Sequence, residues 1–156
     1  MIDKLLDQNF VDQLVVDLET IDLDDRNRIT EWFLANQLMK GKSTLSMLAS
    51  WQHNPSPTLR RLFWYYQARL RWTGKIQDNS QALMEAIEKD MPNEKPEVQW
   101  TMNFTAGWIG VFEEKYRDKC IEIGEKNGLY KDEKVPKGCT PNYLPGFIEI
   151  EVNKRK

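Results

Sequence analysis

Apolar residues recur at helical spacing along almost the whole chain, and turn signals divide them into segments. Leu6, Phe10, Leu14 and Leu18 recur every four residues, which is the spacing of one face of an α-helix. Capping residues, glycines and prolines mark where each later segment begins and ends. The pattern predicts seven helices, over approximately residues 6–18, 22–40, 43–51, 58–72, 80–90, 96–112 and 114–126.

The last apolar segment, Phe147 to Val152, fits either a further helix or a strand, because so short a run has no decisive period. Elsewhere the sequence lacks the apolar–polar alternation of strands. Short loops between helices of this length are typical of antiparallel helix pairs. We therefore predict an all-α fold of about seven or eight helices.

The segment 96–112 is apolar on two sides. Val98, Met102 and Ile109 share one side, and an aromatic series spaced by four residues occupies another: Trp100, Phe104 and Trp108. A helix that is apolar on two sides is usually packed between neighbours. A core role is therefore favoured for at least two of the three aromatic residues.

Composition narrows the classes of function. With 156 residues and 40% hydrophobic residues, the chain is long enough for a single domain with a substantial core over residues 1–156. No apolar run approaches the roughly 20 residues that span a bilayer. A single histidine and two separated cysteines, Cys120 and Cys139, predict no disulfide, metal or cofactor and favour a cytoplasmic protein.

The net charge of −2 argues against a protein that is basic over its whole surface, but a local basic face remains compatible with it. Helix 58–72 carries four arginines: Arg60, Arg61, Arg69 and Arg71. They alternate with Trp64 and Trp72 on two sides that the spacing places away from the core face. Such a pattern suits a phosphate backbone, or else it is a solvated face whose arginine stems cover aromatic rings.

Four segments together resemble a known family. They are Trp32 with Asn36 one turn later, Trp51–Arg61 with its paired arginines, the Val98–Asn103 start of an apolar helix, and Gly138-Cys139-Thr140 in a basic loop. In this order they resemble the DNA alkylation repair (AlkD-like) family of HEAT-like helical-repeat proteins. The resemblance favours a helix for the last segment. It also implies a short member that lacks N-terminal repeats.

The resemblance implies binding of double-stranded DNA, and a glycosylase that releases N-alkylated purines such as 3-methyladenine and 7-methylguanine. By this analogy Trp32 packs beside the nucleotide backbone, Arg61 with Arg60 behind it lines the cleft, and one of the aromatic residues of helix 96–112 is the second cleft aromatic. Asn36 stands where catalytic members carry an aspartate that stabilises positive charge on the sugar, and a neutral amide supplies no such charge. The full set of predicted DNA-binding residues is Trp32, Arg60, Arg61, Arg69, Arg71, Trp100, Phe104, Trp108 and Lys137.

The residues leave alternatives open at each point. Trp32 can equally be a core residue with Asn36 capping a neighbouring helix, and Lys137 can belong to a loop that closes the last repeat. Asn103 is best explained as a buried structural hydrogen bonder, and the basic segment that contains Arg155 as a solvated tail. The alternative function is a non-catalytic helical-repeat module that binds a DNA structure or a protein partner.

Overall fold

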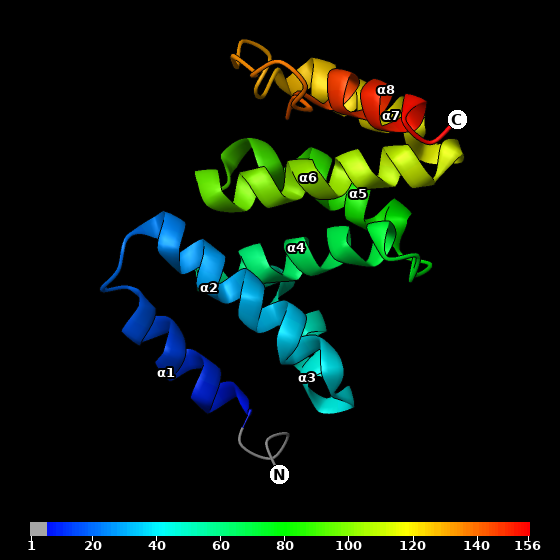
Figure 1. Cartoon of the computed structure of the whole chain (residues 1–156). Helices are drawn as coiled ribbons and strands as arrows, with labels where there is room; N and C mark the ends of the chain where they lie inside the picture. Colours follow the sequence, from blue (N-terminus) through cyan, green and yellow to red (C-terminus); the bar gives the residue numbers. More distant parts are fainter. Residues whose placement is uncertain (1–5) are drawn as a thin grey trace. The chain divides into compact units, whose positions relative to one another are not determined.

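The computed structural model describes residues 6–156, and the regular structure of that part of the chain is entirely helical (Figure 1). This confirms the predicted all-α class. The described residues form eight α-helices: α1 (Gln8–Leu18), α2 (Leu23–Asn36), α3 (Lys42–Ala49), α4 (Pro57–Trp72), α5 (Ser80–Asp90), α6 (Pro96–Phe112), α7 (Glu114–Asn127) and α8 (Leu144–Asn153). Three 3₁₀ turns accompany them: η2 (Leu38–Lys40), η3 (Ser50–His53) and η4 (Met91–Asn93).

Two boundaries differ from the sequence prediction, and the last segment is settled as a helix. α2 ends at Asn36 rather than near Lys40, because the chain tightens into η2 and buries Leu38. The Thr44 hydroxyl donates to the Leu38 carbonyl oxygen at 2.5 Å, which fixes this turn against the start of α3. α3 likewise ends at Ala49 and continues as η3.

Local signals explain where several helices begin and end. The Asp7 carboxylate accepts a hydrogen bond from the Phe10 amide at 2.8 Å, and the Asp22 carboxylate accepts one from the Asp25 amide at 2.9 Å. Both bonds satisfy amides that a helix start leaves without a helical partner. α7 ends at Gly128, whose φ of +63° is a left-handed conformation that glycine adopts without strain.

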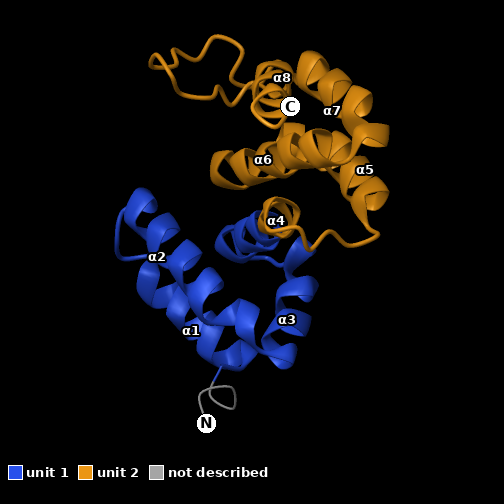
Figure 2. Cartoon of the chain, turned by 45° about the vertical axis from the view of Figure 1, so that its right-hand side comes forward, with its two compact units in different colours: residues 1–66 blue, residues 67–156 orange. Residues whose placement is uncertain are grey.

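The described chain divides into two compact units, residues 1–66 and 67–156, with the boundary inside α4 (Figure 2). In the first unit the largest fully buried side chains are Trp51, Leu34, Leu38, Leu48, Leu59 and Leu62. The Trp51 indole donates to the Gln8 side chain at 2.7 Å, which ties η3 to α1. That the whole chain forms a single HEAT-like domain stays a prediction.

The sequence predicted most of the core positions of these helices. In α4 the apolar residues that recur at helical spacing are all buried: Leu59, Leu62, Phe63, Tyr66 and Leu70. Phe10 departs from the pattern, because its side chain is 46% exposed although its spacing matches the buried stripe of α1.

In the second unit, α6 packs against α7 and α8 (Figure 1). Glycines allow these helices to approach closely. A Cβ atom added at Gly107 would lie 2.7 Å from the Phe147 ring, and one at Gly124 would lie 2.5 Å from Leu144 Cβ and 2.9 Å from Pro145 Cδ. The three-helix contact therefore depends on positions that accept no side chain.

We predict that Gly124→Ala destabilises the protein. Alanine gains about 1 kcal/mol in helix propensity over glycine, but overpacking a filled contact costs about 1–3 kcal/mol, and the atoms in the way are rigid ones near the backbone. Because the clash is with rigid atoms, the overpacking cost should lie near the upper end of that range, which leaves a net loss of about 2 kcal/mol in urea unfolding. Glu125→Ala, at an exposed position of the same helix, is the control and should leave the midpoint almost unchanged. An unaltered unfolding midpoint for Gly124→Ala would contradict the prediction, because it would mean that α8 can shift away from the added methyl group at no cost in stability.

Candidate functional site

A row of four aromatic side chains runs along one side of α6: Trp100, Phe104, Trp108 and Phe112, which we call the aromatic stripe. Trp100 and Phe104 are stacked with ring centroids 4.9 Å apart, and Trp108 and Phe112 are stacked at 5.5 Å. Phe104 meets Trp108 edge-on at 5.9 Å, so the four rings form one continuous contact.

The stripe keeps part of its surface exposed. Phe112 is 37% exposed, and Trp100, Phe104 and Trp108 are each half-buried. The expectation that two of the three predicted aromatic residues belong to the core is therefore wrong. The reason is that the other sides of α6 are taken up by neighbouring helices, so these large rings occupy the side that is left.

Two further rings join the stripe within the same unit. Trp72, at the end of α4, lies 5.5 Å from Phe104 and 5.9 Å from Trp108 between ring centroids. Phe147 of α8 meets Trp108 edge-on at 5.2 Å. Because edge-to-face pairs contribute about 0.5–1.5 kcal/mol each beyond their buried area, this network holds the stripe in a defined geometry.

Arginine side chains lie over the rings of the aromatic stripe and of Trp72. The Arg69 guanidinium is 5.7 Å from the Trp72 ring centroid. The Arg155 guanidinium is 5.1 Å from the Trp108 centroid and 5.2 Å from the Phe112 centroid. A guanidinium over a tryptophan or phenylalanine face is attracted by the ring quadrupole. The arrangement combines flat apolar rings with fixed positive charge.

A buried carboxylate holds the cation beside the stripe. Glu151 is 8% exposed, and its carboxylate accepts hydrogen bonds from Arg155 at 2.6 Å, Lys154 at 2.9 Å and Thr140 at 2.8 Å. Burial opposes the charged form of this carboxyl, but the bonds from Lys154, Arg155 and Thr140 outweigh it and hold the pKa of Glu151 at about 2. The group is therefore ionised at every pH near neutrality.

The sequence pattern placed Arg71 on a side of α4 away from the core, but the structure buries it. Its side chain is 0% exposed, and its Nη2 donates to Asn79 Oδ1 at 2.8 Å and to Ser80 Oγ at 2.7 Å. Nη1 donates to the Gln67 side chain at 3.2 Å, and Nε lies 3.5 Å from Glu113 Oε2. Burial lowers the pKa of the Arg71 guanidinium, and Glu113 opposes that shift. Arg71 thus joins α4, α5 and the start of α7, and its guanidinium does not reach the surface.

Arg61 also departs from the expected solvated face. It is 4% exposed, and its Nη2 donates to the Glu31 carboxylate of α2 at 2.5 Å. Arg60 is half-buried, and its Nη1 donates to the Asn54 and Pro55 carbonyl oxygens at 2.8 and 3.0 Å. These two arginines therefore hold α2 and the turn before α4 in place. Arg69, in contrast, lies over the ring of Trp72.

Trp32 and Asn36 lie one turn apart on α2 in the first unit. The Trp32 side chain is 61% exposed, so it is not a core residue. Asn36 Nδ2 donates to the Trp32 carbonyl oxygen at 2.8 Å, which caps the end of its own helix rather than a neighbour. An exposed tryptophan with a neutral amide beside it offers a flat apolar contact without charge.

The remaining predicted residues fall in loops or in the core. Lys137 and Cys139 are exposed on the loop before α8. Thr140 closes that loop onto α8 through Glu151, which supports a structural role for this end of the loop. Asn103 is 4% exposed and donates to the Asn142 carbonyl oxygen at 2.8 Å, which confirms it as a buried structural hydrogen bonder.

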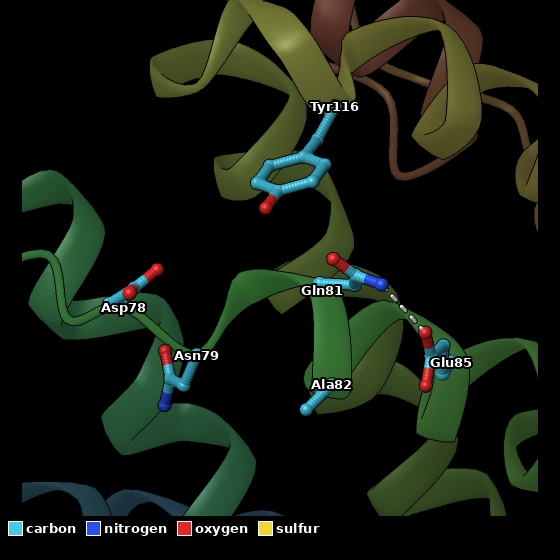
Figure 3. Close-up of a pocket in the computed structure, with 6 residues that line it drawn as sticks. All are labelled: Asp78, Asn79, Gln81, Ala82, Glu85 and Tyr116. Carbon is cyan, nitrogen blue, oxygen red and sulfur yellow. Dashed lines mark hydrogen bonds between the residues drawn. The ribbon is translucent and has the colours of Figure 1, made fainter.

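An open pocket of about 290 Å³ lies between the start of α5 and α7 (Figure 3). It is lined by Asp78, Asn79, Gln81, Ala82, Glu85 and Tyr116. Two of these six residues carry carboxylates and none is cationic. The pocket is therefore unsuited to a phosphate group, in contrast to the aromatic stripe.

Within the described residues, no three histidine, cysteine or acidic side chains gather as a metal site would require. No helix in that part of the chain has the length and apolarity needed to cross a membrane. Neither described cysteine is in a disulfide. Cys120 is buried, and burial together with the charge of Glu113 raises the pKa of its thiol to about 12, which makes it a poor nucleophile.

A scan against protein-family models, a search of curated proteins and a search of solved structures each found no match to this chain. The likeness to the DNA alkylation repair family therefore stays a prediction from the motifs in the sequence.

Sequence reasoning missed two parts of this site. Arg155 was expected to be solvated, yet it packs on Trp108 and Phe112. The spacing of four residues between Glu151 and Arg155 is a signal of an ion pair on one helix face, and it pointed to an ordered cation. Phe112 extends the four-residue spacing of the stripe by one more step. Both signals were present in the sequence.

We predict that Glu113→Gln is strongly destabilising because it leaves the Arg71 guanidinium buried without a counter-charge. Removing one partner of a buried ion pair typically costs about 3–5 kcal/mol. In an Arg71→Met background the same change should cost far less, and urea unfolding of the four proteins gives the coupling energy. Glu88→Gln, which breaks the partly exposed pairs of Glu88 with Lys119 and Lys126, is the control and should have a much smaller effect. Equal costs in both backgrounds would mean that the pair contributes nothing to stability.

Proposed function

We propose that this chain is a DNA-binding protein related to the DNA alkylation repair family, with base release that is slow or absent. The observation that carries the proposal is the aromatic stripe of α6 with guanidinium groups over its rings. Sugars and bases pack on aromatic rings, and arginine binds phosphate oxygens. Both kinds of contact are available on one surface of the second unit.

The first unit supports the same proposal separately. Trp32 exposes a large flat ring on α2, where the family resemblance expects an aromatic contact to the nucleotide backbone. The net charge of −2 disfavours binding only slightly, because a phosphate in contact with the protein responds mainly to the local field of nearby cations. Double-stranded DNA is the partner that the motifs and the geometry together favour.

The chemistry at Asn36 argues against efficient catalysis. Cleavage of a glycosidic bond builds positive charge on the sugar, and a carboxylate stabilises that charge. The Asn36 amide carries no charge, and its Nδ2 is engaged by the helix backbone. Cationic alkylated bases are good leaving groups, so a weak residual activity is compatible with the site.

We predict that the chain binds duplex DNA with an affinity that falls steeply with salt, since counterions are released from each contacted phosphate. Trp100→Ala should weaken binding by about tenfold, because stacking on one aromatic side chain is worth about 1–3 kcal/mol. A fluorescence titration at low and moderate salt measures both effects. Tyr116→Ala removes an aromatic residue from the acidic pocket instead and should bind as the wild type does. Salt-insensitive or absent binding would favour the protein-partner alternative.

We predict that Asn36→Asp raises the release of 7-methylguanine from methylated duplex DNA by about tenfold or more, which corresponds to about 1.4 kcal/mol or more of transition-state stabilisation. The rate above spontaneous depurination is the quantity to measure. Asn27→Asp places the same charge elsewhere on α2 and should leave the rate unchanged. If Asn36→Asp and Asn27→Asp release base equally, Asn36 does not occupy the position of a catalytic carboxylate.

A further inference from the structure

Arg155 is an ordered cation just beyond the end of α8, at the Phe112 end of the aromatic stripe. Its Nη1 donates to the Glu151 carboxylate at 2.6 Å and to the Glu151 carbonyl oxygen at 2.8 Å. Its Cζ lies over the Trp108 and Phe112 rings at 5.1 and 5.2 Å. The carboxylate and the two rings therefore hold the guanidinium from different sides.

The guanidinium keeps donors for another partner. Within the described residues its hydrogen bonds all run through Nη1, and 40% of the side chain is exposed. A guanidinium has five N–H groups in a planar fork that matches phosphate oxygens. Nε and Nη2 can therefore donate hydrogen bonds to an acceptor on a bound partner.

Glu151 does not cancel the positive charge of this cluster. The same carboxylate also pairs with Lys154, whose Nζ lies 2.9 Å from Glu151 Oε1. One negative charge is thus shared between two cations, and the cluster carries a net positive charge beside the rings. Because the carboxylate is buried and the cations are exposed, the positive groups are the ones that face solvent.

We propose that Arg155 contacts one backbone phosphate of bound duplex DNA, and that Glu151 is the positioning residue that holds it there. The proposal rests on the proposed DNA binding and adds a contact that the family resemblance did not supply. Orienting a guanidinium before binding lowers the entropy lost when the phosphate arrives. The rings of Trp108 and Phe112 hold the same guanidinium from a second side.

The test is the salt dependence of duplex binding by the whole chain. Each phosphate contact adds about 0.9 to the slope of log affinity against log salt for B-form DNA. Arg155→Gln should lower the slope by about 0.9, whereas Arg155→Lys keeps the charge and should keep the slope. Arg28→Gln is the matched control, because Arg28 is an exposed arginine that also pairs with a carboxylate one turn away, Asp25.

Glu151→Gln distinguishes an effect of positioning Arg155 from an effect of net charge on DNA affinity. The substitution makes the chain more positive by one unit, so a binding surface that responds only to net charge would bind DNA more tightly. Positioning predicts the opposite, which is a weaker affinity and a smaller slope. Circular dichroism and urea unfolding of each variant identify any loss of fold, and Arg155→Gln serves if Glu151→Gln unfolds.

The outcomes distinguish this inference from the proposed function. If the wild type binds DNA, and the salt slope is smaller for Arg155→Gln but unchanged for Arg28→Gln, the phosphate contact is supported. Wild-type binding with an unchanged slope in Arg155→Gln, or tighter binding by Glu151→Gln, overturns it and leaves DNA binding intact. Absence of salt-sensitive wild-type binding overturns the proposed function and the contact together.

Discussion

The burial of most of α6 is the constraint on which the second unit depends. Ten of its residues are buried, and both Gly107 and Gly110 lie where a Cβ would meet a side chain of α8. A helix enclosed in this way has one side left for its largest residues. The aromatic stripe occupies that side, so the packing that stabilises the fold also leaves part of the surface of these rings accessible.

The same packing explains which parts of the site could be predicted from sequence. The four-residue spacing of Trp100, Phe104 and Trp108 shows directly that they share a side of one helix. Whether that side is buried depends on the neighbours of α6, which the local pattern does not contain. The sequence therefore predicted the series correctly but assigned too much of it to the core.

The arginines of α4 show the limit of pattern reasoning more sharply. Spacing places Arg61 and Arg71 off the apolar core face, which is correct, yet both are buried. Each is neutralised by a carboxylate distant in sequence, Glu31 for Arg61 and Glu113 for Arg71. A buried guanidinium is tolerated only with such a partner. The spacing of residues within α4 does not indicate which distant carboxylate that partner is. The helices themselves were predictable because their signals are local, as the caps at Asp7 and Asp22 show.

The two functional parts of the resemblance, binding and catalysis, make different demands on these residues. Binding needs flat rings and accessible positive charge. The stripe and Trp32 offer the rings, and the half-buried Arg69 and the exposed Arg155 offer the charge. Catalysis needs one formal negative charge at a defined place, and an amide in the position of Asn36 fails that demand whatever its geometry. Rotation of the amide changes the direction of a dipole but creates no carboxylate. Under the proposed function, the chain would therefore bind DNA while releasing bases slowly, because a single neutral side chain removes the one group that distinguishes the transition state from the bound substrate.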